Sequence, residues 1–251
     1  KVQLVLDGSK QVRGVSYIDS WAPSLPHAGW HLFLHICAVE DLELLSLDVN
    51  NVFVQGSRQA GNLWFKYLRA FLRKWGFVPL DTAETIYLRG SLSAGDFQML
   101  AIQVDDIQVA SQSVALQKKF VVNQLGSVFK HMFSPASRFV GYDLERDRAA
   151  KTIKVTAASK VAHVLEAHGL GEVHPKYTPC APGVHLSSDS SGQRVDVNTY
   201  QSLVGAFQFI REFRPDISFA VGKLSKFLVS PNLDHMDAAL YLAGYLRRTA
   251  S

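Results

Sequence analysis

The sequence predicts an α+β fold in which an antiparallel sheet is followed by a helical unit. Three observations lead to this prediction. Apolar segments of strand length reverse at polar turns in two places, at Asp105-Asp106 and within residues 138–155. Other segments repeat apolar residues at three- and four-residue spacing, which is typical of amphipathic helices. Beyond residues 175–196, a Pro-containing stretch with a cluster of Ser and Asp, the helical pattern continues alone.

The first half of the chain predicts two helices and two strands. Residues 2–6 are expected to form a strand that ends at a turn-forming Asp-Gly pair. Residues 28–40 and 63–75 each place apolar side chains at helical spacing, so we expect two helices with one buried face each. Between them, residues 44–54 are rich in Leu, Val and Phe, and we expect a buried strand there.

The second half predicts two hairpins and then four helices. Residues 99–104 and 107–111 are expected to pair around the two aspartates, and residues 138–155 predict a second hairpin with charges at its tip. The four helices are predicted at residues 158–168, 200–213, 216–228 and 235–248. Asp216 follows a helix-breaking Arg-Pro pair, so we expect its side chain to cap the helix that begins there.

Composition and charge exclude several classes of protein. With 251 residues, of which 47% are hydrophobic, the chain can bury a substantial core, which excludes a disordered protein. Lys and Arg (26) exceed Asp and Glu (22) too slightly to indicate a polyanionic partner. Cys37 and Cys180 lie far apart, which predicts neither a disulfide framework nor a cysteine zinc site. The apolar run at residues 31–39 is far shorter than the ~20 residues of a membrane span, so we expect a soluble intracellular protein.

The two adjacent aspartates form the strongest candidate site. Asp105 and Asp106 lie where two apolar strands reverse, so their carboxylates would be held at a hairpin tip. Magnesium prefers such oxygen ligands, and two ions ~4 Å apart can activate a hydroxyl and stabilise a leaving pyrophosphate. Asp48 interrupts an apolar strand and is a candidate third ligand. An Asp-Asp pair is more often a solvated turn, so spacing leaves both interpretations open.

The helix predicted at residues 63–75 has a basic face. Lys66, Arg69 and Arg73 recur at helical spacing, and Arg58 precedes them. Such a face can follow the phosphates of a nucleic acid, each contact adding salt-dependent affinity. The same pattern is also found on helices whose charged face only contacts solvent, so both interpretations stay open.

Six segments match, in order, the motifs of one known family. They are KVQLVLDGSKQVRGVSYIDSWAPS, LDVNNVFVQG, SRQAGNLWFKYLRAFLRKWGF, QVDDIQVAS, RFVGYDLERDRAAKTIKV and the long segment from Thr199 to Thr249. In that order they resemble the fingers segment, the first catalytic-aspartate motif, the template-side loop and helix, the paired-aspartate motif, the primer-grip hairpin and the helices before RNase H of the copia-type reverse transcriptases. The resemblance covers nearly the whole chain, with one gap.

The resemblance implies a catalytic and metal-binding role for Asp48, Asp105 and Asp106, with the main-chain carbonyl of Val49 as a further ligand of Mg²⁺ or Mn²⁺. Phe53 matches the aromatic residue that excludes a 2′-hydroxyl on the incoming nucleotide, although core packing is an equal alternative for it. The implied reaction is RNA-directed DNA synthesis from deoxynucleoside triphosphates on an RNA or DNA template-primer. No membrane partner is implied.

Other matched positions imply contacts with substrate and nucleic acid. The candidates for substrate binding are Val49, Phe53, Arg58 and Gln59. The candidates for nucleic-acid binding are Lys66, Arg69, Arg73, Gly141 and Tyr142. The last two match the hairpin that holds the primer end, although a Gly-Tyr pair in any hairpin can also be turn chemistry alone.

The resemblance also implies an architecture and a location. It is that of a palm-type polymerase, with fingers and an antiparallel palm sheet in residues 1–158 and a helical thumb or connection unit in residues 159–251. The expected location is a cytoplasmic virus-like particle or the nucleus.

The sequence departs from the family pattern at several places. The family has a long stretch where this chain passes directly from one motif to the next, which predicts an internal deletion near residues 56–57. Gln103 replaces an aromatic residue, Gln3 replaces an arginine and Gly61 replaces a proline. Two hypotheses therefore stand side by side: an active polymerase, or a relic that folds and binds nucleic acid or a protein partner without polymerising.

Overall fold

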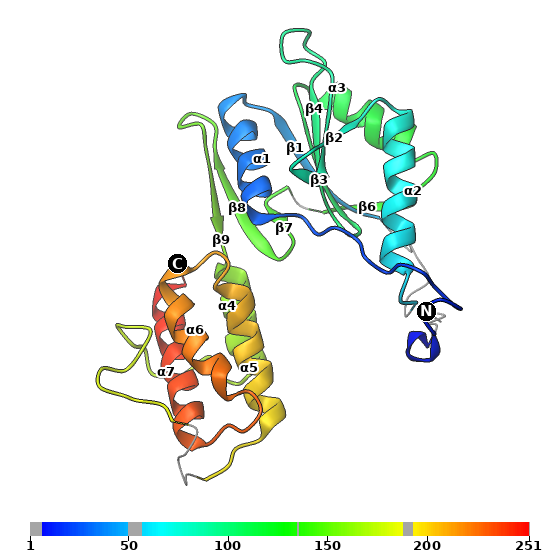
Figure 1. Ribbon diagram of the computed structural model, residues 1–251. Coiled ribbons are helices and arrows are strands. Elements are labelled where there is room, and N and C mark those ends of the chain that lie inside the picture. Colours follow the sequence, from blue (N-terminus) through cyan, green and yellow to red (C-terminus); the bar gives the residue numbers. More distant parts are fainter. Residues whose placement is uncertain (1–6, 50–56, 135, 188–192, 251) are drawn as a thin grey trace. The chain divides into compact units, whose positions relative to one another are not determined.

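The computed structural model describes residues 7–49, 57–134, 136–187 and 193–250 (Figure 1). They form two compact units. The sheet unit comprises the described parts of Lys1–Val140 together with Leu144–Lys154, and the helical unit comprises Gly141–Asp143 with the described parts of Val155–Ser251. Helices and antiparallel sheets occur together, which confirms the predicted α+β class. No helix among these residues is both long and apolar enough to cross a membrane.

The sheet unit is built on six strands in the order β2-β3-β4-β5-β1-β6, with every neighbouring pair antiparallel. The strands are β1 (Glu43–Val49), β2 (Val78–Leu80), β3 (Ala83–Arg89), β4 (Gln98–Gln103), β5 (Asp106–Ser111) and β6 (His131–Ser134). The predicted hairpin around the two aspartates is confirmed as β4 and β5. The strand predicted at residues 44–54 is confirmed up to Val49, and the remainder of that segment, like the strand predicted at residues 2–6, lies outside the described residues.

Alternation along the strands gives the sheet two different faces, because successive side chains point to opposite sides. Leu47 of β1 and Val109 of β5 lie on the face covered by α2 (Ala60–Lys74), α3 (Val114–Lys118) and the π-helical segment η2 (Lys119–Leu125). On the other face, the Trp30 indole of α1 (His27–Val39) donates a hydrogen bond to Gln108 of β5. Figure 1 shows α1 and α2 on opposite sides of the sheet. Both helices confirm the predictions from apolar spacing.

A smaller sheet contains β7 (Arg138–Phe139), β8 (Tyr142–Asp147) and β9 (Thr152–Thr156) in that order. The predicted second hairpin is confirmed as β8 and β9. A short 3-10 helix, η1 (Gly8–Lys10), lies near the start of the described chain.

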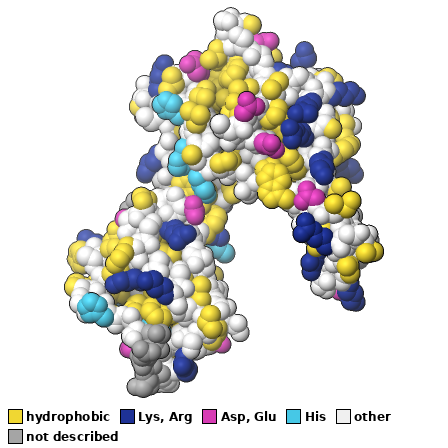
Figure 2. Space-filling view, viewed as in Figure 1, with side chains coloured by type: hydrophobic (Ala, Val, Ile, Leu, Met, Phe, Trp, Pro, Cys, Tyr) yellow, Lys and Arg dark blue, Asp and Glu magenta, His cyan; other side chains and the backbone are white. Residues whose placement is uncertain are grey.

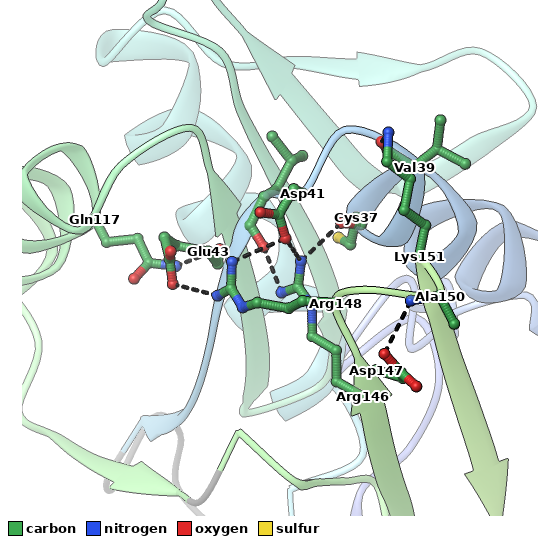
Figure 3. A network of polar contacts seen from close by, with 11 residues as sticks. Cys37, Val39, Asp41, Glu43, Gln117, Arg146, Asp147, Arg148, Ala150 and Lys151 are labelled. Carbon is green, nitrogen blue, oxygen red and sulfur yellow. Dashed lines mark hydrogen bonds and ion pairs between the residues drawn. The ribbon is translucent and has the colours of Figure 1, made fainter.

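Two arginines of β8 and its turn fasten this hairpin to the segment that begins β1 (Figure 3). Arg146 donates to the main-chain carbonyl of Leu42 at 2.6 Å and to the carboxylate of Asp41 at 2.8 Å. Arg148 bridges the carboxylates of Asp41 and Glu43 at 2.8 Å each. The Arg146 side chain is 17% exposed and that of Arg148 is 46% exposed, so Arg146 forms the better-shielded part of this clamp.

The helical unit consists of helices that pack around one apolar core. They are α4 (Ala158–Ala167), α5 (Val197–Ile210), the 3-10 helix η3 (Pro215–Ile217), α6 (Ser218–Leu224), the 3-10 helix η4 (Ser225–Phe227) and α7 (Leu233–Thr249). Fully buried Tyr200, Phe207 and Leu242 contribute to their common core. Side-chain caps begin two of the helices, with Asp196 before α5 and Asn232 before α7. The four predicted helices are confirmed, the third of them in three short pieces.

The predicted capping role of Asp216 is wrong. Arg214 is the residue that precedes η3, which places Asp216 inside the first turn instead of before it. The Asp216 carboxylate accepts two hydrogen bonds from the Arg214 guanidinium, at 2.8 and 2.9 Å, and a third from the Tyr245 hydroxyl. These contacts lower the pKa of Asp216, with the Arg214 hydrogen bonds as the main cause.

Candidate functional site

Four strands bring four side chains into one line across the sheet. β1 and β5 pair so that Asp48 lies directly opposite Asp106. On either side, Met132 of β6 is opposite Asp48, and Gln103 of β4 is opposite Asp106. Directly opposed residues of antiparallel strands project to the same face with Cβ atoms about 5 Å apart. Met132, Asp48, Asp106 and Gln103 therefore form a continuous row, called here the carboxylate row.

Asp105 lies in the tight turn that joins β4 to β5. Its main-chain carbonyl accepts a hydrogen bond of 3.0 Å from the Val49 amide at the end of β1. The first turn residue, Val104, has a φ of 57°, whereas Asp105 has no positive φ. This φ pattern is that of a type II′ turn, which normally has Gly at the first position. For a β-branched residue the conformation costs on the order of 1–3 kcal/mol.

The carboxylates of the row and the turn influence one another electrostatically. Burial raises the pKa of Asp106 to about 6, and the neighbouring charges of Asp105 and Asp48 add to the effect. Burial and the Asp105 charge also raise the pKa of Asp48. Each ionised carboxylate therefore makes ionisation of its neighbours less favourable, and a cation bound among them would instead favour their ionised forms.

The chemistry of these donors fits a hard divalent cation, because Mg²⁺ and Mn²⁺ prefer carboxylate and carbonyl oxygens. Asp48 and Asp106 are adjacent on one face, and Asp105 follows in the turn. Within the described part of the chain, however, no three His, Cys, Asp or Glu side chains form a group that is ready to hold one metal ion. Val49 has a buried side chain, so only its main chain is available to a ligand.

A hydrogen bond from α2 reaches the turn that bears Asp105. The indole Nε1 of Trp64 donates to the main-chain carbonyl of Val104 at 2.6 Å. The apolar spacing of residues 63–75 predicts only that Trp64 lies on the buried face of the helix, and it does not indicate this contact. A signal was present, because a buried indole N–H usually finds an acceptor. Met132 was also missed, since nothing in the sequence indicates that it lies opposite Asp48.

The basic face of α2 is only partly free for a ligand. Lys66 and Arg73 are exposed. Arg69 forms an ion pair of 3.5 Å with Glu84, and its guanidinium lies 6.0 Å from the centre of the Phe65 ring. In Figure 2 the visible face of the sheet unit has acidic side chains among hydrophobic ones, with Lys and Arg side chains beside them.

The candidates for substrate binding have mixed positions. The Arg58 guanidinium donates to the carbonyl of Gly8 at 2.8 Å and to the Tyr17 hydroxyl at 3.3 Å, so it already has partners in the described N-terminal segment. Gln59 directly precedes α2 and makes no capping hydrogen bond through its side chain. Phe53 lies outside the described residues.

The Gly141-Tyr142 pair belongs to the helical unit. Gly141 has a φ of 81°, a conformation that glycine adopts readily. The Tyr142 ring is 2% exposed and stacks on Phe209 with ring centres 5.0 Å apart. A ring that is packed in this way cannot present its face to a nucleic acid, so a contact at this pair would have to involve the main chain.

Two of the three substituted positions lie within the described residues. Gln103, in the carboxylate row, accepts a hydrogen bond of 2.7 Å from the Leu25 amide and so ties the segment before α1 to β4. Gly61 lies in the first turn of α2. Gln3 lies outside the described residues.

Comparison with known proteins gives one consistent result. The family model described as reverse transcriptase (RNA-dependent DNA polymerase) matches residues 53–182. The retrovirus-related Pol polyprotein from transposon TNT 1-94 of Nicotiana tabacum is 24% identical over 289 residues, covering 99% of this chain and 22% of the relative. That from transposon RE1 of Arabidopsis thaliana is 26% identical over 285 residues, covering 99% of this chain and 19% of the relative.

A shorter relative gives the same picture. The putative transposon Ty5-1 protein of Saccharomyces cerevisiae is 29% identical over 205 residues, which are 78% of this chain and 63% of that protein. This chain thus spans about a fifth of the length of the Pol polyproteins that it matches. Their matched stretches of 289 and 285 residues exceed the 251 residues of this chain, so these relatives have residues without a counterpart here. No solved structure matches the chain.

Proposed function

Because the chain belongs to the reverse transcriptase (RNA-dependent DNA polymerase) family, in its copia-type retrotransposon branch, we propose that it is the DNA-synthesising region of a retrotransposon polyprotein. The observation that supports this function most strongly is the direct pairing of Asp48 with Asp106, next to the turn that bears Asp105. The proposed reaction extends a primer 3′-hydroxyl with deoxynucleoside triphosphates along an RNA or DNA template.

The proposed role of the three aspartates is to hold the divalent cations on which this family of enzymes generally depends. Two bound Mg²⁺ or Mn²⁺ ions supply positive charge at the attacking hydroxyl and at the leaving pyrophosphate. Asp48 and Asp106 contribute opposed carboxylates from rigid strands, and the Val49 amide holds the turn that bears Asp105 against the end of β1. The pKa of Asp106 is raised to about 6, so this carboxylate binds a cation best above that pH, where it is ionised. Burial and the Asp105 charge raise the pKa of Asp48 as well.

The proposed contacts to nucleic acid come from exposed cations on α2. Lys66 and Arg73 on α2 have the freedom to meet template phosphates, and Arg69 contributes less because it is paired with Glu84. Phe53 keeps its proposed role in selecting deoxynucleotides, and Arg58 and Gln59 keep theirs in binding substrate. In the same proposal the sheet unit provides fingers and palm, the helical unit provides a thumb or connection, and the reaction occurs in a virus-like particle or in the nucleus.

Primer extension tests this proposal. Purified protein is given an oligo-dT primer on a poly-A template with dTTP and either Mg²⁺ or Mn²⁺. We expect extension that Asp48→Asn and Asp106→Asn each reduce by at least ~100-fold, because each loses a charge at the reacting centre. Asp81→Asn, in the exposed turn between β2 and β3, is the matched control and should extend normally. Extension that survives both Asp48→Asn and Asp106→Asn would remove these residues from the mechanism.

A second function has specific support. The relatives contain residues that this chain lacks, and no three potential ligands converge among the described residues. Both observations favour a relic that binds nucleic acid without extending a primer. For such a relic, affinity for a template-primer falls steeply as salt rises, while no extension occurs with either metal ion. Measuring binding and extension on the same preparation separates the two functions.

A further inference from the structure

The turn that bears Asp105 is strained, and two hydrogen bonds hold it from different sides. Val104 has a φ of 57°, which a β-branched residue adopts at a cost. The Val49 amide donates to the Asp105 carbonyl at 3.0 Å, and the Trp64 indole donates to the Val104 carbonyl at 2.6 Å. Trp64 itself is 4% exposed and makes an edge contact with the Phe129 ring at 5.3 Å between centres.

The Val104 carbonyl belongs to the central peptide of this turn. In two-residue hairpins, type I′ and type II′ turns differ in the orientation of that peptide and in the φ of the second turn residue. Asp105 has no positive φ, so the turn has the type II′ pattern. A donor bound to the Val104 carbonyl opposes rotation of the central peptide, and that rotation would change the direction in which Asp105 leaves the turn.

We propose that Trp64 is a positioning residue that locks the Val104-Asp105 turn and thereby fixes Asp105 beside the Asp48–Asp106 pair. Its indole N–H is a donor that acts through the main chain and touches no reacting atom. Trp64 also belongs to α2, the helix with the exposed Lys66, so it joins the proposed nucleic-acid-binding helix to the aspartate turn. The catalytic importance of this turn rests on the proposed function. The effect of the Trp64 hydrogen bond on the conformation of the turn does not.

Amide hydrogen exchange measures the lock without any need for catalysis. The reporter is the Val49 amide, because its acceptor is the Asp105 carbonyl in the turn. We expect Trp64→Phe to speed exchange of this amide by about 10-fold, the effect of losing one partly buried hydrogen bond. Trp75→Phe makes the same chemical change roughly 16 Å further along the helix and should leave the exchange rate of this amide unchanged.

A rescue experiment distinguishes a lock from general loosening of the core. Val104→Gly removes the strain, because glycine adopts positive φ freely. In that background the effect of Trp64→Phe on the Val49 amide should shrink to about 2-fold or less, since the two changes act on one turn. An equal effect of Trp64→Phe in both backgrounds, or an equal effect of Trp75→Phe, would overturn the proposal. If Trp64→Phe does not fold, the benzothienyl analogue of tryptophan at position 64 keeps the ring size and removes only the N–H.

Primer extension adds a functional readout and separates the two proposals. If Trp64 positions Asp105, Trp64→Phe lowers kcat several-fold while KM for the template-primer stays unchanged, because α2 and its Lys66 are intact. A wild-type protein that extends no primer would contradict the proposed function. The hydrogen-exchange result would still show whether Trp64 holds the Val104-Asp105 turn. An unchanged exchange rate of the Val49 amide in Trp64→Phe, together with an active wild-type protein, would contradict only the proposed role of Trp64.

Discussion

Replacing Asp106 by Asn should make the protein more stable at alkaline pH, although the same change removes a proposed ligand. The pKa of Asp106 is raised from 3.8 to about 6, by burial first and by the neighbouring Asp105 and Asp48 charges second. The folded protein therefore retains this proton at pH values where the unfolded chain has lost it. Stability falls as pH rises between these two values, because the folded state binds more protons there.

The magnitude follows from the size of the shift. Raising the pKa from 3.8 to about 6 corresponds to roughly 3 kcal/mol of unfavourable free energy once the group is ionised. Asp106 is only partly buried, so solvent screens part of this penalty, and we expect about 1–2 kcal/mol. Asn has nearly the same shape and no charge, so Asp106→Asn should gain that amount at pH 8 and almost nothing at pH 4.

Urea denaturation at the two pH values, without divalent cations, measures the difference. The exposed Asp81→Asn serves as the matched control, and as a surface substitution it should change the free energy of unfolding by less than about 0.5 kcal/mol. Adding Mn²⁺ at pH 8 should stabilise the wild type and narrow its gap to Asp106→Asn. An Asp106→Asn protein that is less stable than the wild type at pH 8 would refute the view that this carboxylate is strained by burial and like charge.

Three further predictions concern other parts of the molecule. Arg146→Ala should lower the free energy of unfolding by about 2–3 kcal/mol, because it leaves main-chain and carboxylate acceptors without their donor. The side chain of Arg148 is more exposed, so Arg148→Ala should lower it by less than about 1 kcal/mol. Urea denaturation of both variants measures the difference. Lys66→Ala and Arg73→Ala should each reduce the slope of log affinity against log salt by about 1 for a template-primer, as measured by fluorescence anisotropy. Tyr200→Phe should destabilise the protein by about 1–3 kcal/mol in thermal denaturation, because its buried hydroxyl donates to a main-chain carbonyl at 2.9 Å.

The sequence predicts the elements with strong periodicity. Residues 63–75 place large apolar side chains at helical spacing, and α2 buries that stripe against the sheet. The hairpin of β4 and β5 was predictable because two apolar strands flank a polar reversal. β2 and β3 were not predicted. β2 has only three residues and contains Pro79, a residue that weakens a strand assignment. β6 spans only His131–Ser134, which is too short for alternation to be recognised.

The site was predictable in its residue types but not in its arrangement. Asp48 and Asp106 could be proposed as ligands of one metal site, but their direct pairing depends on β1 lying next to β5. The order of strands in a sheet cannot be predicted from local sequence patterns. The contact of Trp64 with the Val104 carbonyl depends on how α2 packs on the sheet. Tyr142 matched a functional motif, yet its ring is packed against Phe209, because burial is a property of the fold and not of the motif.

Anomalous diffraction from a crystal soaked in Mn²⁺ shows whether Asp48 and Asp106 together hold a divalent cation. We expect a manganese peak between their carboxylates, within bonding distance of both, and its loss in Asp106→Asn crystals. Manganese bound elsewhere, with no peak between these two carboxylates, would mean that the pair is not a metal site.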